Sequence, residues 1–158
     1  MIRVLLLIAA EEEGVPLRDA GGQRVIPLQG RVLIVDDEEA VLEFERDVLA
    51  GAGAEVSTAT RGEDAIRQLQ RGKFDAILVD SWIPGGCSGV DIYRWVATNQ
   101  PGLEKRVVLT LSNMTDSEIR SFVEENGVAT ITKPFEVSDL IAVARSAMQK
   151  TQSTVAVP

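Results

Sequence analysis

Hydrophobic and polar positions follow two different periods along most of this chain. Short apolar runs predict buried strands at residues 32–35, 55–59, 76–79, 106–111 and 128–132. Between these runs, apolar residues recur at helical spacing and predict helices at residues 39–50, 62–70, 90–98, 116–126 and 138–150. Five strands thus alternate with five helices. This alternation is typical of an α/β fold, a doubly wound parallel sheet with helices on both faces.

The apolar positions within the predicted helices mark the sides that we expect to face the sheet. In the first helix these positions are Val41, Phe44 and Val48, and in later helices Trp95 and Phe122 have core spacing. The stretch "TDSE", residues 115–118, is a capping box that predicts the start of the fourth helix.

The first thirty residues do not follow this pattern. Seven apolar residues, 4–10, are too few to cross a bilayer, and three glutamates follow them. A signal peptide is one interpretation, but a short strand fits better, and no membrane association is predicted. Four glycines and two prolines between residues 11 and 30 predict a connector. We expect three parts: an N-terminal extension and linker at 1–30, a domain at 31–150, and a disordered tail at 151–158.

The composition narrows the possible functions. The formal net charge of −8 argues against nucleic-acid binding, which needs a basic face. The chain has no histidine, so a histidine-ligated metal or a histidine general base within it is excluded. Its one cysteine, Cys87, cannot form an internal disulfide, which suits a reducing cytoplasm.

Charged residues directly follow three of the predicted strands. Asp36 and Asp37 come after the first strand, Asp80 after the third and Lys133 after the fifth. In a parallel sheet, ligands bind outside the carboxyl ends of the strands, so we expect these side chains to converge at one edge. Taken singly, the acids could be helix-terminal or turn residues and the lysine a solvated charge. Their joint placement favours a site.

Such an acidic cluster suits a hard divalent cation. Mg²⁺ prefers oxygen ligands and is typically held by one or two carboxylates together with phosphate oxygens. Without a cation, close carboxylates repel one another, and at least one pKa should rise. With Mg²⁺ bound, Asp80 would be placed to attack a phosphoryl group, and Lys133 would pair with a phosphoryl oxygen.

Three motifs, "VLIVDDEE", "FDAILVD-SWIP" and "ITKPF", resemble those of the receiver domain of bacterial response regulators, the CheY-like family. The resemblance covers about residues 31–150. It implies a flavodoxin-like fold with strand order 2-1-3-4-5. It also implies Mg²⁺-dependent phosphorylation by the phosphohistidine of a partner, a histidine kinase or a histidine phosphotransfer domain.

The resemblance assigns roles to individual residues. Asp80 matches the phosphoacceptor, Asp36 and Asp37 match the acidic metal pair, and Lys133 matches the phosphoryl-binding lysine. Trp82 matches the position whose backbone carbonyl ligates the metal. The resemblance also implies a cis peptide bond between Lys133 and the proline after it.

The chain departs from the family pattern at three places. Ile83 replaces the usual methionine, and the loop between Pro84 and Gly89 is one residue longer than usual. At the second place, the hydroxyl expected at the end of the fourth strand, a gapless count from Lys133 reaches Leu111. The flanking hydroxyls, Thr110 and Ser112, are both candidates, and we favour Ser112 because it follows the apolar run.

The third departure is Thr130, which stands where many members of the family carry an aromatic switch residue, so aromatic-rotation signalling is in doubt.

These features leave three hypotheses for the function. The main hypothesis is a non-enzymatic phosphoacceptor that acts by protein contact, with a homodimer as a possibility. The first alternative is a pseudo-receiver that binds partners without phosphorylation. The second, a haloacid-dehalogenase-like phosphohydrolase, is disfavoured because it needs Asp-x-Asp, whereas Asp36 and Asp37 are adjacent.

Residues 1–30 also resemble the end of a kinase domain followed by a linker, as in hybrid histidine kinases with a C-terminal receiver. We therefore expect the domain to keep its stability when residues 1–29 are deleted.

Overall fold

The computed structural model describes residue 22 and residues 26–112 and 116–150. One five-stranded sheet runs through the molecule in the order β2-β1-β3-β4-β5, and every neighbouring pair is parallel. This is the predicted doubly wound, flavodoxin-like fold. In chain order the elements are β1 (Arg31–Val35), α2 (Glu39–Gly51), β2 (Glu55–Ala59), α3 (Gly62–Arg71), β3 (Ala76–Asp80), α4 (Gly89–Asn99), η1 (Leu103–Arg106), β4 (Val107–Leu111), α5 (Ser117–Asn126), β5 (Ala129–Thr132) and α6 (Val137–Gln149).

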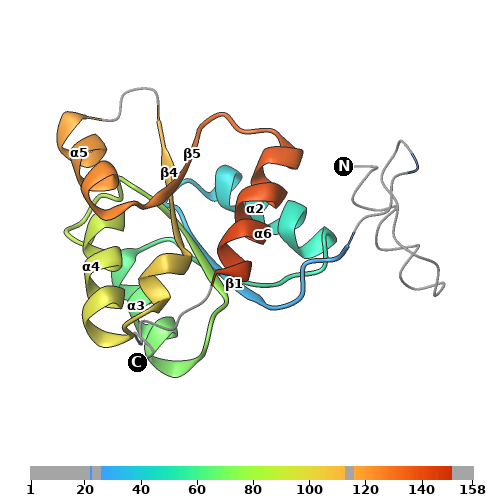
Figure 1. The fold of residues 1–158 in the computed structure, drawn as a ribbon, viewed down its shortest axis with the longest axis horizontal. Helices are drawn as coiled ribbons and strands as arrows, with labels where there is room; N and C mark the ends of the chain where they lie inside the picture. The colour runs from blue at the N-terminus through green and yellow to red at the C-terminus, as the bar shows by residue number, and fades with distance from the viewer. Residues whose placement is uncertain (1–21, 23–25, 113–115, 151–158) are drawn as a thin grey trace, which may run out of the picture.

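The sheet separates two apolar cores. Helices α2 and α6 cover one face, while α3, α4 and α5 cover the other (Figure 1). The strand side chains alternate between the faces, so that Val32 and Ile34 belong to the first core, and Leu33 and Val35 to the second. The central strands are buried on both sides, which explains why their sequences are continuous apolar runs.

Residues 26–30, which we assigned to the connector, pack against this domain. Leu28 is only 2% exposed and lies in the core with α2 and α6. Its backbone N–H donates to the carbonyl of Ala52 over 2.8 Å, and the carbonyl of Ile26 accepts a hydrogen bond from Arg145. The core of the domain therefore includes Leu28, which precedes the expected boundary at Arg31.

The apolar face of α2 differs from the prediction. Val48 is buried as expected, but Val41 and Phe44 are only half-buried. The fully buried side chains include Leu42 and, between the apolar turns, Glu45. The buried face of α2 is therefore rotated about the helix axis relative to the predicted face. The reason is that α2 packs on both the sheet and α6, whereas the sequence pattern identifies only a general apolar side.

The other helices follow the prediction more closely, with small changes. Trp95 and Phe122 pack at the edge of the second core and are partly buried. Helix α5 has Asp116 as its N-cap, whose carboxylate accepts the N–H of Ile119 over 2.9 Å, while residue 115 of the predicted capping box lies outside the described residues. Within the described ranges, no helix has the length and hydrophobicity to cross a membrane.

Candidate functional site

Three charged side chains emerge at the carboxyl edge of the sheet and on the same face. In each of β1, β3 and β5, alternate residues before Asp36, Asp80 and Lys133 pack in the core with α2 and α6. Since side chains alternate along a strand, these three residues point to that same side. The predicted convergence is therefore present.

Lys133 joins Asp36, which is buried, to Asp80, which is half-buried. Its Nζ donates to Asp36 Oδ2 over 2.8 Å and to Asp80 Oδ2 over 3.0 Å. The other carboxylate oxygens accept backbone N–H groups, Asp36 Oδ1 from Glu38 over 2.9 Å and Asp80 Oδ1 from Trp82 over 3.1 Å. Both carboxylates are thus oriented by one backbone group and one shared ammonium. The Lys133–Pro134 peptide is cis, as the resemblance implied.

Burial shifts the protonation of this site. It raises the pKa of Asp80 above its ordinary value, and the hydrogen bonds from Trp82 and Lys133 only partly oppose this rise. For Lys133, burial lowers the pKa, but hydrogen bonds to Asp36 and Asp80 outweigh it and hold the pKa above its ordinary value. The lysine is therefore a permanent positive charge at neutral pH.

Asp37 completes a cluster with the charge of a cation site. One carboxylate oxygen each of Asp36, Asp37 and Asp80 lies within 4.8 Å of the others, and Asp37 is exposed to solvent. Three carboxylates and Lys133 leave two formal negative charges, which a divalent cation would balance. Hard oxygen donors of this kind fit Mg²⁺. The residues present are therefore suited to the ion that the sequence predicted.

The structure places the two hydroxyl candidates, Thr110 and Ser112, on one side of β4 and Leu111 on the other. Thr110 is in register with Asp80, is 1% exposed, and has a hydroxyl without a hydrogen-bond partner. Leu111 packs in the opposite core, so the gapless count points to the wrong face. Ser112 is exposed and lines a hollow together with Lys133. Both hydroxyl residues therefore share the face of Asp80.

The loop after β3 is held close to Asp80. Helix α4 begins at Gly89, where an added Cβ would collide with the backbone carbonyl of Asp80, so this position requires glycine. Gly85 and Gly86 of this loop both have a φ of +101°, a backbone conformation that favours glycine. Trp82 in this loop is 65% exposed beside the site.

Glu45 is a buried acid that the sequence analysis did not identify. It is 1% exposed, and its Oε1 has no hydrogen-bond partner. Its pKa is raised from 4.5 to about 8, first by burial and then by the charge of Asp36. A signal was available in the sequence, since Glu45 lies three residues after Leu42 and four before Leu49, on one helix face.

A hollow of about 610 Å³ opens beside Lys133. Its walls are mostly apolar, and Phe44 of α2 stacks on Phe135 with ring centroids 6.3 Å apart. The lining residues are Ala40, Val41, Phe44, Ser112, Lys133, Pro134 and Phe135. The half-buried aromatic side chains thus form an apolar surface next to the charged cluster.

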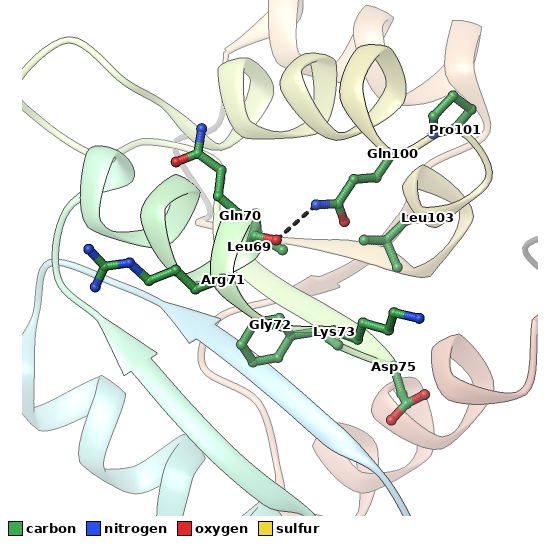
Figure 2. A pocket seen from close by; sticks show the side chains of 10 residues that line it. Leu69, Gln70, Arg71, Gly72, Lys73, Asp75, Gln100, Pro101 and Leu103 are labelled. Atoms are coloured by element: carbon green, nitrogen blue, oxygen red, sulfur yellow. Dashed lines mark hydrogen bonds between the residues drawn. The ribbon is translucent and has the colours of Figure 1, made fainter.

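A second hollow, of about 560 Å³, lies at the opposite, amino edge of the sheet. Figure 2 shows Gln100 reaching toward Leu69, whose carbonyl accepts its Nε2 over 2.8 Å, while Arg71 extends away from them. The hollow separates the C-terminal ends of α3 and α4, and this hydrogen bond ties the two helices together. The residues that line this hollow include no acidic cluster and no buried nucleophile, so we infer that it is a gap in the packing of the two helices and not a functional site.

The chain belongs to the response regulator receiver domain family, because the model of that domain matches residues 32–145. The fold and family that the sequence motifs suggested are thereby confirmed. Members of this family are receivers of two-component systems, so that is the class of this protein.

Individual relatives agree with this assignment. The transcriptional regulatory protein DltR of Streptococcus agalactiae is 31% identical over 113 residues, which cover 71% of this chain and 49% of DltR. The chain thus spans about half the length of that relative. Protein Rrf1 of Nitratidesulfovibrio vulgaris is 26% identical over 121 residues, covering 77% of this chain and 84% of Rrf1. Among solved structures, a CheY-like receiver domain protein of Methanospirillum hungatei is 29% identical with a TM-score of 0.61, covering 75% of this chain and 93% of that one.

Proposed function

We propose that this receiver accepts a phosphoryl group on Asp80, with Mg²⁺, from a histidine kinase or a histidine phosphotransfer domain. The observation that carries the proposal is the convergence of Asp36, Asp37, Asp80 and Lys133 at one edge of the sheet. In this role the chain is an acceptor that assists its own phosphorylation and dephosphorylation, and it signals by contact with another protein, in the cytoplasm.

The chemistry follows from the positions of these groups. A carboxylate oxygen of Asp80 attacks phosphorus, an O–P bond forms, and the P–N bond of the donor breaks with its electron pair remaining on the imidazole nitrogen. Lys133 already contacts Asp80 Oδ2, so it lies where it can bind an oxygen of the incoming group. Mg²⁺, held by the three aspartates and the Trp82 carbonyl, would neutralise charge on the phosphoryl oxygens.

The hydroxyl that binds a further phosphoryl oxygen is Ser112 or Thr110. Ser112 lines the open hollow with Lys133, which supports it as the group that meets an incoming ligand. Thr110 lies beside Asp80 with an unpaired hydroxyl, which supports it as a donor that is satisfied only after phosphorylation.

The apolar hollow beside Lys133 supports a protein donor rather than a small molecule. Phe44 and Phe135 border the charged cluster, so a partner that covered them would exclude water while bringing its phosphohistidine to Asp80.

Beryllofluoride, a mimic of the phosphoryl group, tests the proposal. We expect saturable binding that requires both Mg²⁺ and the carboxylate of Asp80. The binding is monitored by the fluorescence of the exposed Trp82. The variant Trp82→Phe, in which Trp95 is the remaining tryptophan, serves as the control. Binding that is equal with and without Mg²⁺, or no binding at all, would refute the assignment.

A further inference from the structure

Helix α2 buries one carboxylic acid in the layer where it packs against the sheet. Glu45 lies between Leu42 and Leu49 on the helix face that forms the core with β1 and α6, and it is 1% exposed. Its Oε1 has no hydrogen-bond partner. Burial of an unpaired carboxyl group costs free energy, and the cost is far larger when the group is ionised. An apolar side chain here would stabilise the helix packing, so the acid calls for a functional explanation.

The charged groups that act on Glu45 belong to the phosphorylation site. Asp36 at the end of β1 and Asp80 at the end of β3 disfavour its ionisation, whereas Lys133 after β5 favours it. Helix α6 presents apolar residues to the shared core, and its Arg145 bonds instead to the carbonyl of Ile26. Burial is thus the largest cause of the raised pKa of Glu45, and the charge of the acidic cluster adds to it.

We propose that Glu45 holds a proton while the cluster of Asp36, Asp37 and Asp80 lacks a cation, and that it releases this proton when a divalent cation binds there. The inference rests on the cation site of the proposed function. The O–H bond of the carboxyl group breaks, the electron pair stays on the carboxylate oxygen, and the proton passes to water. The charge of the region then rises by one unit for each ion bound, instead of two.

The physical reason is that the two causes of the raised pKa respond differently to a cation. Burial of Glu45 is unchanged when an ion binds, whereas the repulsion from Asp36 and Asp80 is cancelled. The pKa of Glu45, about 8 without the ion, should therefore fall part of the way toward 4.5. We expect this pKa to fall by about 0.5 to 1.

Linkage makes this coupling reciprocal, so cation affinity should rise with pH. If Mg²⁺ lowers the pKa of Glu45 by about 0.5, the affinity for Mg²⁺ is greater at the alkaline limit than at the acid limit by a factor of roughly three. The gain falls in the window around pH 8, where Glu45 titrates. Protonation of Asp80 itself also competes with the cation, and burial raises the pKa of Asp80 as well, so the comparison with Glu45→Gln separates the two effects.

The test uses the full chain with carbon-13 in its glutamate carboxyl groups. Carboxyl chemical shifts are followed against pH by NMR, with and without saturating Mg²⁺, and Glu45→Gln identifies the signal of Glu45. We expect a midpoint near pH 8 without Mg²⁺ and a lower one with it. Calorimetry of Mg²⁺ binding at pH 8, in buffers of different ionisation enthalpy, should show proton release by wild type and none by Glu45→Gln. Glu43→Gln, which removes an exposed acid of the same helix, should release protons like wild type.

The outcomes separate this inference from the proposed function. If Mg²⁺ binds wild type and the midpoint of Glu45 does not move, the coupling is refuted and the cation site stands. If the signal titrates near 4.5 without Mg²⁺, the coupling is also refuted. If wild type binds no Mg²⁺ at any pH, the cation site and the coupling fall together.

Discussion

The two edges of the sheet carry similar charged residues, but they balance them differently. At the amino edge, Asp75 accepts the backbone N–H of Arg31 over 2.8 Å, and its carboxylate lies 3.5 Å from Arg106 Nη1. The guanidinium group of Arg106 also donates to the carbonyls of Asp75 and Lys150, and that of Arg31 stacks over Phe74 at 4.8 Å. One acid there meets more than one donor.

At the carboxyl edge, by contrast, the acidic groups outnumber the cationic groups. Asp36 and Asp80 share the ammonium group of Lys133, Asp37 belongs to the same cluster, and the further acid Glu45 is buried under their charge. The acid of the amino edge is therefore paired within the chain, and we expect it to contribute to stability. The carboxyl edge contains repulsion that a cation or a phosphoryl group could relieve, which is the property expected of a binding site.

Matched substitutions of one aspartate at each edge should separate function from stability most strongly. We expect Asp80→Asn to abolish phosphorylation without loss of stability, because the change is nearly isosteric and removes one of the repelling charges. Asp75→Asn should keep phosphorylation and lower the melting temperature by a few degrees. Intact mass after incubation with a phosphodonor and Mg²⁺ measures the first effect, and thermal unfolding measures the second. If Asp80→Asn gains a phosphoryl group as readily as wild type, Asp80 is not the phosphoacceptor.

The buried acid of the carboxyl edge should make stability depend on pH. The folded pKa of Glu45, about 8, exceeds its ordinary value of 4.5, so between these values the folded state holds a proton that the unfolded state has lost. Stability should therefore fall as pH rises through this window, by up to about 5 kcal/mol, and level off above it. In Glu45→Gln this part of the slope should vanish, and in Glu43→Gln it should remain. Denaturant unfolding at several pH values measures the slopes, and parallel curves for wild type and Glu45→Gln would contradict the burial of an ionisable acid.

Deletions at the N-terminus test how far the amino edge is structural. The sequence led us to expect that residues 1–29 are dispensable, but Leu28 is buried in the core. We now expect deletion of residues 1–25 to be tolerated, and deletion of 1–29 to cost about 2–4 kcal/mol, as does the point variant Leu28→Ala. Equal unfolding free energies for the two deletions would show that residues 26–29 add nothing to the core.

Mg²⁺ should stabilise the carboxyl edge through linkage to the folded state. We expect a rise of a few degrees in the melting temperature of wild type, and loss of most of this rise in Asp37→Ala. Glu39→Ala removes an exposed acid a short way along the chain, outside the cluster, and should keep the rise. If all three proteins gain equally from Mg²⁺, Asp37 is an ordinary acid near a helix N-terminus.

The smallest effect concerns the two hydroxyl groups. We expect Ser112→Ala to slow phosphorylation or weaken beryllofluoride binding, because a hydrogen bond to a phosphoryl oxygen is lost. Thr110→Val should leave both unchanged and raise stability by about 1 kcal/mol, because it removes an unpaired buried hydroxyl. The reverse result would transfer the role to Thr110. No effect from either variant would mean that the site works without a hydroxyl at this position.

The sequence predicted the strands, the helices and the edge of the sheet where the site lies. These features follow from local periodicity and from a general rule of parallel sheets, that polar residues after successive strands meet at one edge. The convergence of Asp36, Asp37, Asp80 and Lys133 could therefore be predicted without coordinates. The family motifs added the strand order, which the local pattern does not contain.

Other features required the tertiary structure because they depend on partners far along the chain. The burial of Leu28 depends on contact with the end of α2, and the network of Asp75 depends on Arg31 and Arg106, which lie in other strands and turns. The exclusion of Leu111 depends on which side of β4 each residue faces, and a count along the sequence does not determine this.

Glu45 shows most clearly which features the sequence determines and which depend on the tertiary structure. The sequence alone determined that a carboxyl group lies between Leu42 and Leu49 on one face of a helix. Only the packing of α2 against the sheet and α6 decided that this face turns inward and buries the carboxyl group. The physical reason is that helical periodicity is a property of neighbouring residues, whereas burial and the electric field of Asp36 and Asp80 arise from residues that only the fold brings together.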